Sequence, residues 1–283
     1  MSPAKIAVLV VGFVLLVTAL FYQQLTGSLR KVRTDEATAL VERSAGLFLQ
    51  QNRLQSLEFT SQTAQYARQE AFSRLAGIAD PVARQKEAHR LVNALNEEQI
   101  SKAYDRRAAL VAIVDDAGKV VTRDLNPQAD VGDDLKSRYP AVGMALAGSA
   151  SKDIWAYKKR MYRVACAPIR GTDGKIFGAL IVGFEESARD AKTQGGALGT
   201  QLAVFLDGQI YASSFATSGK ESTEEQELAK SLFAGPQYAA PAVKSRLLTA
   251  PFQVQIPGNG SFVAVAAPLR RTAAFTRATT SRG

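Results

Sequence analysis

Residues 160–184 read RMYRVACAPIRGTDGKIFGALIVGF. Two runs rich in small and β-branched residues, Arg160–Ile169 and Lys175–Phe184, flank the turn signal Gly171–Gly174. Runs of this composition, bounded by a glycine-rich turn, are typical of β-strands. The stretch therefore predicts two strands of an antiparallel sheet.

The sequence on the N-terminal side extends this sheet. Ala109–Val114 and Lys119–Arg123 flank the turn Asp115–Gly118 and predict a hairpin, and Asp153–Tyr157 predicts one more strand. A polar loop and a helical stretch ending at Gly148 lie between them. The pattern indicates an α+β module with an antiparallel sheet of about five strands.

A weaker copy of this module follows. LVAIVDDAGKVVTRDL at residues 110–125 matches QLAVFLDGQIYASSF at 201–215, and YRVACAPIR at 162–170 matches FVAVAAPLR at 262–270. Two matches in the same order predict an internal repeat of about 90 residues. The copy has no counterpart of the strand Lys175–Phe184, so we expect the second module to be incomplete.

A long helix is expected before the first module. Proline is absent from Gly27 to Gly77, and apolar residues recur every seven positions. One row holds Leu40, Leu47 and Leu54, with Val41 and Phe48 beside it; the second, shifted by three, holds Leu57, Ala64 and Ala71. The rows fit either a helix packed on the core or a dimeric coiled coil. Asp80-Pro81 predicts the start of another helix that reaches about Tyr104.

The N-terminus carries an apolar run from Ile6 to Phe21. A helix of this length reaches about 25 Å, near the lower limit for a membrane span. A cleaved signal peptide is the alternative, but Ala19-Leu20-Phe21 is not a small-x-small cleavage site. We therefore expect a single-pass anchor over residues 6–22. Arg30, Lys31 and Arg33 follow the run and, by the positive-inside rule alone, indicate a cytoplasmic body.

Composition argues against several classes of function. The 283 residues carry a net charge of +9, but no nucleic-acid recognition motif accompanies it. A single histidine, His89, and a single cysteine, Cys166, supply few ligands for a metal, and neither has a catalytic partner in the sequence. His89 is expected on a solvent-exposed helix face and Cys166 in the core. We expect no enzyme, no metal, no cofactor and no nucleic-acid partner.

The chain resembles a bacterial Cache sensor of the double type, a relative of PAS folds. The resemblance covers about Gly27 to Leu269, and its most specific part is YPAV at 139–142, ALAG at 145–148, Trp155, YRVA at 162–165, API at 167–169 and GALIVGF at 178–184. Such a sensor implies an extracytoplasmic receptor region that binds a small organic ligand. It thus implies an inner-membrane protein whose bulk is periplasmic, against the Arg30–Arg33 charges.

This reading divides the chain into five parts. Residues 1–27 form the cytoplasmic tip and anchor, 28–107 the long helix and second helix, 108–190 the first PAS-like module, 197–272 the second, and 273–283 a disordered tail. The fold class is α+β, with a transmembrane and long helix followed by two tandem PAS-like antiparallel-sheet modules. A homodimer through the long helix is a further expectation.

A ligand site is expected in the first module. Such a site needs aromatic walls and a few converging polar groups. Trp155, Tyr157 and Tyr162 alternate along one hairpin, and Arg138 and Tyr139 precede the nearby helical stretch, where an arginine suits a ligand carboxylate. The competing interpretation is that these aromatic residues fill the core. The corresponding alternative function is a membrane-tethered adaptor whose sheets contact other proteins.

Overall fold

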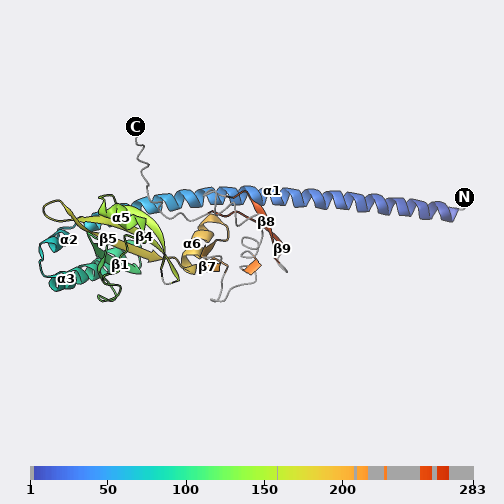
Figure 1. Ribbon diagram of the computed structural model, residues 1–283. Helices are drawn as coiled ribbons and strands as arrows, with labels where there is room; N and C mark the ends of the chain where they lie inside the picture. Colours follow the sequence, from blue (N-terminus) through green and yellow to red (C-terminus); the bar gives the residue numbers. More distant parts are fainter. Residues whose placement is uncertain are drawn as a thin grey trace, which may run out of the picture.

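A computed structural model describes residues 3–157, 159–206, 209–215, 226–227, 249–256 and 260–267. It describes the side chains of all of these except residues 3–30, 209, 255–256 and 260–261. One long helix, α1, runs the length of the molecule, and a body of helices and strands lies along its C-terminal half (Figure 1). The predicted tail, 273–283, falls outside the described residues.

Helix α1 (Pro3–Ala67) is continuous through 65 residues, which confirms that the long helix extends the N-terminal segment without a break. It was predicted to reach Gly77, but it ends ten residues earlier. The chain turns into the short helices α2 (Glu70–Arg74) and η1 (Leu75–Gly77). Phe72 and Leu75 are each 1% exposed, so the turn brings two large apolar side chains into the core.

The predicted leucine row does not face the body. Leu40, Leu47 and Leu54 are 50%, 51% and 59% exposed. Of the second row, Leu57 and Ala71 are also exposed. Ser44 is buried instead, and its hydroxyl donates to the carbonyl oxygen of Leu198 at 3.2 Å. A small residue lets α1 approach its neighbour closely, which the leucine face would prevent.

The first module contains a five-stranded sheet in which all neighbours are antiparallel, as predicted. Its strand order is β2-β1-β5-β4-β3. The strands are β1 (Leu110–Asp115), β2 (Val120–Arg123), β3 (Ser151–Tyr157), β4 (Arg160–Arg170) and β5 (Ile176–Glu185). The α+β class and the antiparallel sheet are therefore confirmed.

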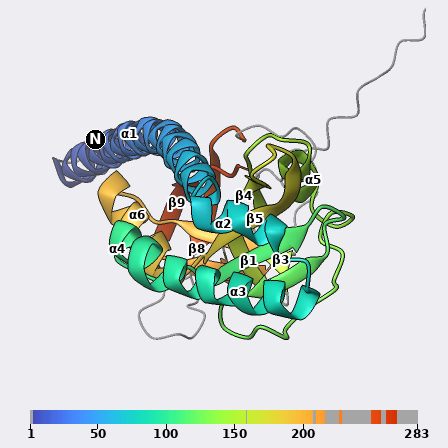
Figure 2. The same cartoon turned by 90° about the vertical axis from the view of Figure 1, so that its left-hand side faces the viewer.

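Both faces of this sheet are buried. One carries alternate residues such as Val111, Leu180 and Val182 against α1, α2 and α3 (Pro81–Ala94). The other carries Ala112, Cys166 and other residues of the opposite parity against α5 (Pro140–Leu146). Figure 2 shows α3 and α4 (Ser101–Tyr104) passing in front of the sheet, with α5 to the side.

The second helix begins as predicted. The Asp80 carboxylate accepts hydrogen bonds from the backbone N–H groups of Val82 (3.2 Å) and Ala83 (3.1 Å) and so caps α3. The helix then widens into the π-helical turn η2 (Leu95–Ile100) before α4. His89 is half-buried, with Nδ1 3.0 Å from the Arg123 carbonyl oxygen, so the expectation of a solvent-exposed histidine was wrong.

A buried polar cluster joins η2 to the first hairpin. Asn96 is fully buried, and its amide nitrogen donates to Asp124 Oδ2 (2.6 Å) and to the Ala108 carbonyl oxygen (3.0 Å). Asp124 is 2% exposed and accepts from the Val111 N–H at 3.1 Å. Each charged or polar group here has a partner, as burial requires. The cluster therefore aligns the helical layer with the start of β1.

Two further hairpins lie beside α1. They are β6 (Ala203–Leu206) with β7 (Gln209–Ser213) and β8 (Phe252–Ile256) with β9 (Gly260–Ala264). Residues 216–225, 228–248 and 268–283 lie outside the described residues, so the expectation that the second module is incomplete stays untested. We call these two hairpins the second module below.

The hairpin β6–β7 repeats a detail of β1–β2. Val111 and Asp124 exchange two bonds: Val111 N–H to the carboxylate, and Asp124 N–H to the Val111 carbonyl oxygen at 2.9 Å. At the aligned positions, Leu202 N–H donates to Ser214 Oγ, and Ser214 N–H donates to the Leu202 carbonyl oxygen, both at 2.8 Å. Both hairpins also shift register at the matching step. These shared features support the proposed repeat at its first hairpin.

The glycine-containing segment between the modules is helical. Helix α6 (Ala188–Leu198) runs through Gly195 and Gly196, with Ser187 as its N-cap. A side chain at Gly195 would meet the Thr200 carbonyl oxygen at 2.7 Å. The glycine therefore permits a close backbone approach and does not act as a flexible joint.

Among the residues whose side chains are described, no helix has an apolar stretch long enough to cross a membrane. The expected span, residues 6–22, lies outside those side chains.

We predict that Asp124→Ala lowers the free energy of unfolding by about 3 kcal/mol, because the Asn96 amide and the Val111 N–H lose a charged acceptor inside the core. Urea unfolding followed by circular dichroism measures the change. Asp173→Ala, in an exposed turn, is the control and should change stability by less than about 1 kcal/mol. Equal losses in the two variants would contradict a special role for Asp124.

Candidate functional site

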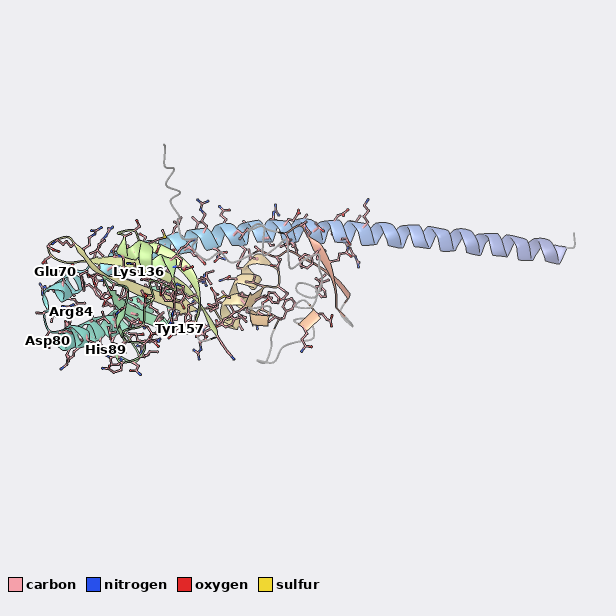
Figure 3. All side chains as sticks on the ribbon, in the orientation of Figure 1. Glu70, Asp80, Arg84, His89, Lys136 and Tyr157 are labelled. Carbon is pink, nitrogen blue, oxygen red and sulfur yellow. The ribbon has the colours of Figure 1, made fainter. Side chains whose placement is uncertain are left out.

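The predicted aromatic residues of the first module do gather. Tyr139 and Trp155 stack with ring centroids 3.9 Å apart and planes 16° apart, and Tyr162 lies opposite Trp155 in the β3–β4 pairing. Their exposed fractions are 4%, 2% and 8%. Tyr157 is half-buried and packs against them, and Figure 3 places it on the side of the first module that faces α6. We call these four residues the aromatic cluster.

Strand periodicity explains this gathering. Ser151, Asp153, Trp155 and Tyr157 alternate along β3 and share the face covered by α5. Tyr139 has an extended backbone just before Pro140 starts α5, so its ring lies over that face. Arg138, one residue earlier, is exposed, and it lines neither of the two cavities described below. The structure therefore unites four of the five predicted site residues.

The aromatic cluster contains one unsatisfied donor. The indole Nε1 of Trp155 is buried and has no hydrogen-bond partner among the described residues. Asp153, 4% exposed, lies two residues before it on the same face. Burial raises the pKa of the Cys166 thiol, and the nearby Asp153 charge adds to this effect. The thiol is therefore protonated at neutral pH and acts as a small core group, as the sequence predicted.

A separate groove of about 1310 Å³ lies between α1, the first module and α6. Its apolar walls are Phe48 and Phe59 of α1, Tyr104 of α4 and Phe184 of β5. Three of these rings form one contact set: Phe59 and Phe184 lie 5.4 Å apart, and Tyr104 and Phe184 lie 4.9 Å apart. Val204 of β6 and Ala267, which follows β9, also line the groove. The groove is thus the place where the helix and both modules meet.

Two ion pairs line this groove. Arg163 of β4 contacts the carboxylate of Glu186, and the two side chains are 24% and 12% exposed. Arg106 reaches both carboxylate oxygens of Asp190 on α6, at 3.0 and 2.9 Å. The Arg106 guanidinium also lies 4.9 Å from the centre of the Phe184 ring, a cation–π distance. The Arg106–Asp190 pair connects the segment before β1 to α6, and the Arg163–Glu186 pair connects β4 to the residue that follows β5.

The groove carboxylates differ in acidity. Burial raises the pKa of Glu186, although the neighbouring Arg163 opposes this effect. Burial acts in the same direction on Asp190, but hydrogen bonds from Ser187 and Arg106 outweigh it and leave the pKa of Asp190 lowered. Glu186 is therefore the easier of the two to protonate, and a proton on Glu186 would weaken its hold on Arg163.

The sequence analysis did not identify this groove. Its walls come from residues 48 to 267, and no short motif links them. The one available signal was the sequence Phe184-Glu185-Glu186, which places two carboxylates at the end of the last strand beside Arg163. Within the described part of the chain, no set of three or more His, Cys, Asp or Glu side chains is arranged to hold a metal ion.

Comparison with known proteins identifies similar structures. No protein-family model matches the sequence, and no curated protein matches it. Among solved structures, the sensor domain of the histidine kinase DctB from V. cholerae matches with 13% identity, 72% of this chain and 78% of that chain covered, and a TM-score of 0.44. The ligand-binding domain of the Campylobacter jejuni chemoreceptor Tlp3, in complex with L-valine, matches with 15% identity, 83% and 88% covered, and a TM-score of 0.42.

The periplasmic domain of Vibrio cholerae LuxQ is also similar, with 11% identity, 82% of this chain and 99% of that chain covered, and a TM-score of 0.44. These three solved structures are described as a sensor domain, a ligand-binding domain and a periplasmic domain.

Proposed function

We propose that this chain is a membrane-anchored sensor that binds a small organic molecule and passes the bound state to α1. The observation that carries the proposal is the groove of about 1310 Å³, because its walls include α1, the sheet and α6 together. A ligand there would contact the long helix directly. If the ligand bound more tightly to one packing arrangement of α1 than to another, binding would shift α1 toward the first arrangement.

The charges of the groove favour a ligand with a carboxylate. An arginine binds a carboxylate through two parallel hydrogen bonds, and Arg163 already holds one carboxylate, that of Glu186. A ligand carboxylate that replaced Glu186 at Arg163 would leave the Glu186 side chain without its partner. Glu186 is buried, and its pKa is already raised. Glu186 would then take up a proton and remain in place without a buried unpaired charge.

The aromatic cluster together with Arg138 is the second proposed location of the ligand, as the sequence analysis expected; its residues would be Arg138, Tyr139, Trp155, Tyr157 and Tyr162. The unpartnered Trp155 Nε1 supports it, since a ligand acceptor would satisfy that donor. The burial of Tyr139, Trp155 and Tyr162 favours the groove, which is already open.

The adaptor remains the alternative function. The specific observation in its favour is the filled α5 face of the sheet, where the stacked Tyr139 and Trp155 rings occupy the space that a ligand would need. An adaptor would use the outer surface of this module for protein contacts and would need no small molecule.

A second copy of the chain is the proposed partner of α1. Leu40, Leu47 and Leu54 repeat at seven-residue intervals and are at least half exposed, with Leu57 one turn further at 57%. A seven-residue leucine repeat on a free helix face matches the seam of a two-helix coiled coil. This part of α1 runs alongside the body (Figure 1), but the leucine side chains themselves are exposed, so a partner helix has access to them.

The proposal also includes a membrane anchor and the side of the membrane on which the body lies. The apolar run Ile6–Phe21 belongs to the continuous helix α1, so a span there would connect rigidly to the groove. We place the body outside the cytoplasm, in the periplasm, with residues 6–22 in the inner membrane. The competing signal is the Arg30–Arg33 charge cluster.

For the ligand site, we predict that a thermal-shift screen of the full chain finds small organic acids or amines that stabilise it. At a ligand concentration of 100 times Kd, the expected stabilisation is about 2.7 kcal/mol. Arg163→Gln should weaken binding at least about tenfold, because it removes the guanidinium proposed to hold the ligand carboxylate. Arg160→Gln is the matched control: Arg160 is on the same strand, pairs with Glu185, and lies outside the groove lining.

Arg138→Ala separates the two ligand locations. Loss of binding in Arg138→Ala with full binding in Arg163→Gln would place the ligand at the aromatic cluster and contradict the groove. Trp155 is the only tryptophan, so its fluorescence reports on the cluster alone. Failure of every compound to stabilise the chain would favour the adaptor.

For the dimer, we predict that the full chain in detergent sediments as a dimer and that Leu47→Glu with Leu54→Glu makes it monomeric, because like charges would face each other across the seam. Analytical ultracentrifugation measures the mass. Val82→Glu, at an exposed valine of α3, is the control and should remain dimeric. A wild-type chain that is monomeric at micromolar concentration would overturn this partner.

For topology, we predict that an alkaline phosphatase fused after Gly283 is active in cells, because this enzyme needs the oxidising periplasm to form its disulfides. A green fluorescent protein at the same position, exported unfolded, should stay dark. The reverse result would place the body in the cytoplasm and make the Arg30–Arg33 cluster the correct guide.

A further inference from the structure

A second, smaller cavity of about 190 Å³ lies at the end of the first module where α1 stops. It is separate from the groove: the two share no lining residue. Figure 3 shows Glu70 and Asp80 at this end of the molecule, far from the N-terminus of α1. The cavity is lined by Ala64, Ala67 and Arg68 of α1 and the following turn, Ser73 of α2, Gly148 and Ala150 after α5, and Pro168 and Arg170 of β4.

The strand edge explains why the cavity exists. β3 begins at Ser151, opposite Cys166 of β4, so β4 continues beyond its neighbour with an open edge. Pro168 lies on that edge and has no N–H with which to pair a longer β3. Gly148 follows α5 with φ +100°, and a Cβ there would lie 3.3 Å from Arg170 Nη2. The glycine and the proline together leave room beside the Arg170 guanidinium.

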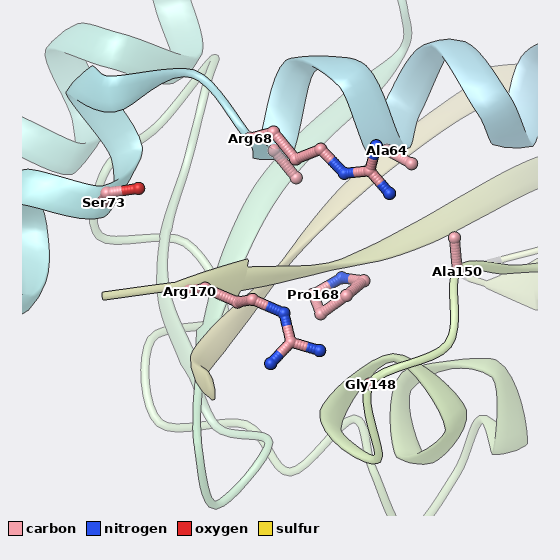
Figure 4. Close-up of a pocket in the computed structure, with 8 residues that line it drawn as sticks. Ala64, Arg68, Ser73, Gly148, Ala150, Pro168 and Arg170 are labelled. Carbon is pink, nitrogen blue, oxygen red and sulfur yellow. The ribbon is translucent and has the colours of Figure 1, made fainter. Parts of the chain in front are cut away.

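Two guanidinium groups line this space, and the lining contains no carboxylate. Figure 4 shows the Arg68 and Arg170 side chains extending alongside Pro168, with Gly148 and Ala150 next to them. Arg170 Nη1 donates to the Gly174 carbonyl oxygen at 3.0 Å, which fixes the group and leaves Nη2 toward the cavity. Within the described part of the chain, neither arginine forms a salt bridge, whereas most other arginines near the sheet do.

We propose that this cavity is a binding site for a small oxyanion, with Arg68, Arg170 and Ser73 as the donors. Guanidinium groups present paired N–H donors that match the paired oxygens of a carboxylate or a phosphate, and a hydroxyl supplies a further donor. The volume suits inorganic phosphate or a short dicarboxylate. An anion there would bridge the end of α1 to the end of β4 and relieve the repulsion between two like charges.

Isothermal titration of the full chain in detergent tests the site, with inorganic phosphate and succinate as probes and sodium chloride at matched ionic strength as the reference. The chain is basic overall, with a net charge of +9, so the chloride reference removes non-specific attraction. We expect saturable binding of at least one probe and no binding of chloride at that concentration. Phosphate binding alone would assign tetrahedral oxyanions, and succinate binding alone would assign carboxylates.

Arg68→Gln and Arg170→Gln should each weaken binding at least about tenfold, since each removes a charged donor. Arg74→Gln is the matched control: it removes one charge from the same end of the molecule, but Arg74 pairs with Glu70 and does not line the cavity. Arg170→Lys keeps the charge and loses the paired donors, so its affinity should fall between those of the wild type and Arg170→Gln. Arg163→Gln should bind the probe normally, which keeps this test independent of the groove.

Circular dichroism and melting in chloride check that the variants fold; both arginines are exposed, so we expect wild-type melting curves. The proposal is overturned if neither probe binds more tightly than chloride. It is also overturned if Arg74→Gln loses as much affinity as Arg68→Gln, because net charge alone would then explain the binding.

Discussion

A carboxylate inside a protein core must be hydrogen-bonded, and the first module is organised around one that meets this requirement. Asp124 ends the first hairpin, accepts from the Val111 N–H and from the Asn96 amide, and so holds strand β1 and turn η2 in one position. The π-helical widening at η2 brings Asn96 to the carboxylate. Because β1 lies between β2 and β5, the same contact sets where the helical layer lies on the whole sheet.

The second module repeats this arrangement with a neutral group. Ser214 takes the position of Asp124, and Leu202 that of Val111, with the same exchange of two hydrogen bonds. A serine hydroxyl satisfies one N–H without the cost of burying a charge. The local pairing of the hairpin therefore persists in both places, whereas the charged contact to a covering helix belongs to the first module.

In the proposed function, the ligand site is formed where α1 meets the other elements and not by a short sequence motif. The groove is lined by residues from α1, both modules and α6, and the smaller cavity beside Arg68 and Arg170 is lined by residues from the end of α1, α2 and β4. Both spaces have α1 as a wall, so a bound molecule in either would act on the same helix. The ion pair between Arg163 and Glu186 provides a contact in the groove that a ligand and a proton would both change.

The sequence by itself determined what depends on near neighbours: the strands, their turns, the Asp80 helix start, and the α+β class. These follow from alternation, capping and turn chemistry within a few residues. Tertiary structure decided which face of α1 packs, that Gly195 lies in a helix, and that Arg138 stays outside while Tyr139 is buried. Those outcomes depend on the close approach of segments that are distant in the sequence. At such contacts a small residue such as Ser44, or a glycine such as Gly195, allows packing that a row of leucines would prevent.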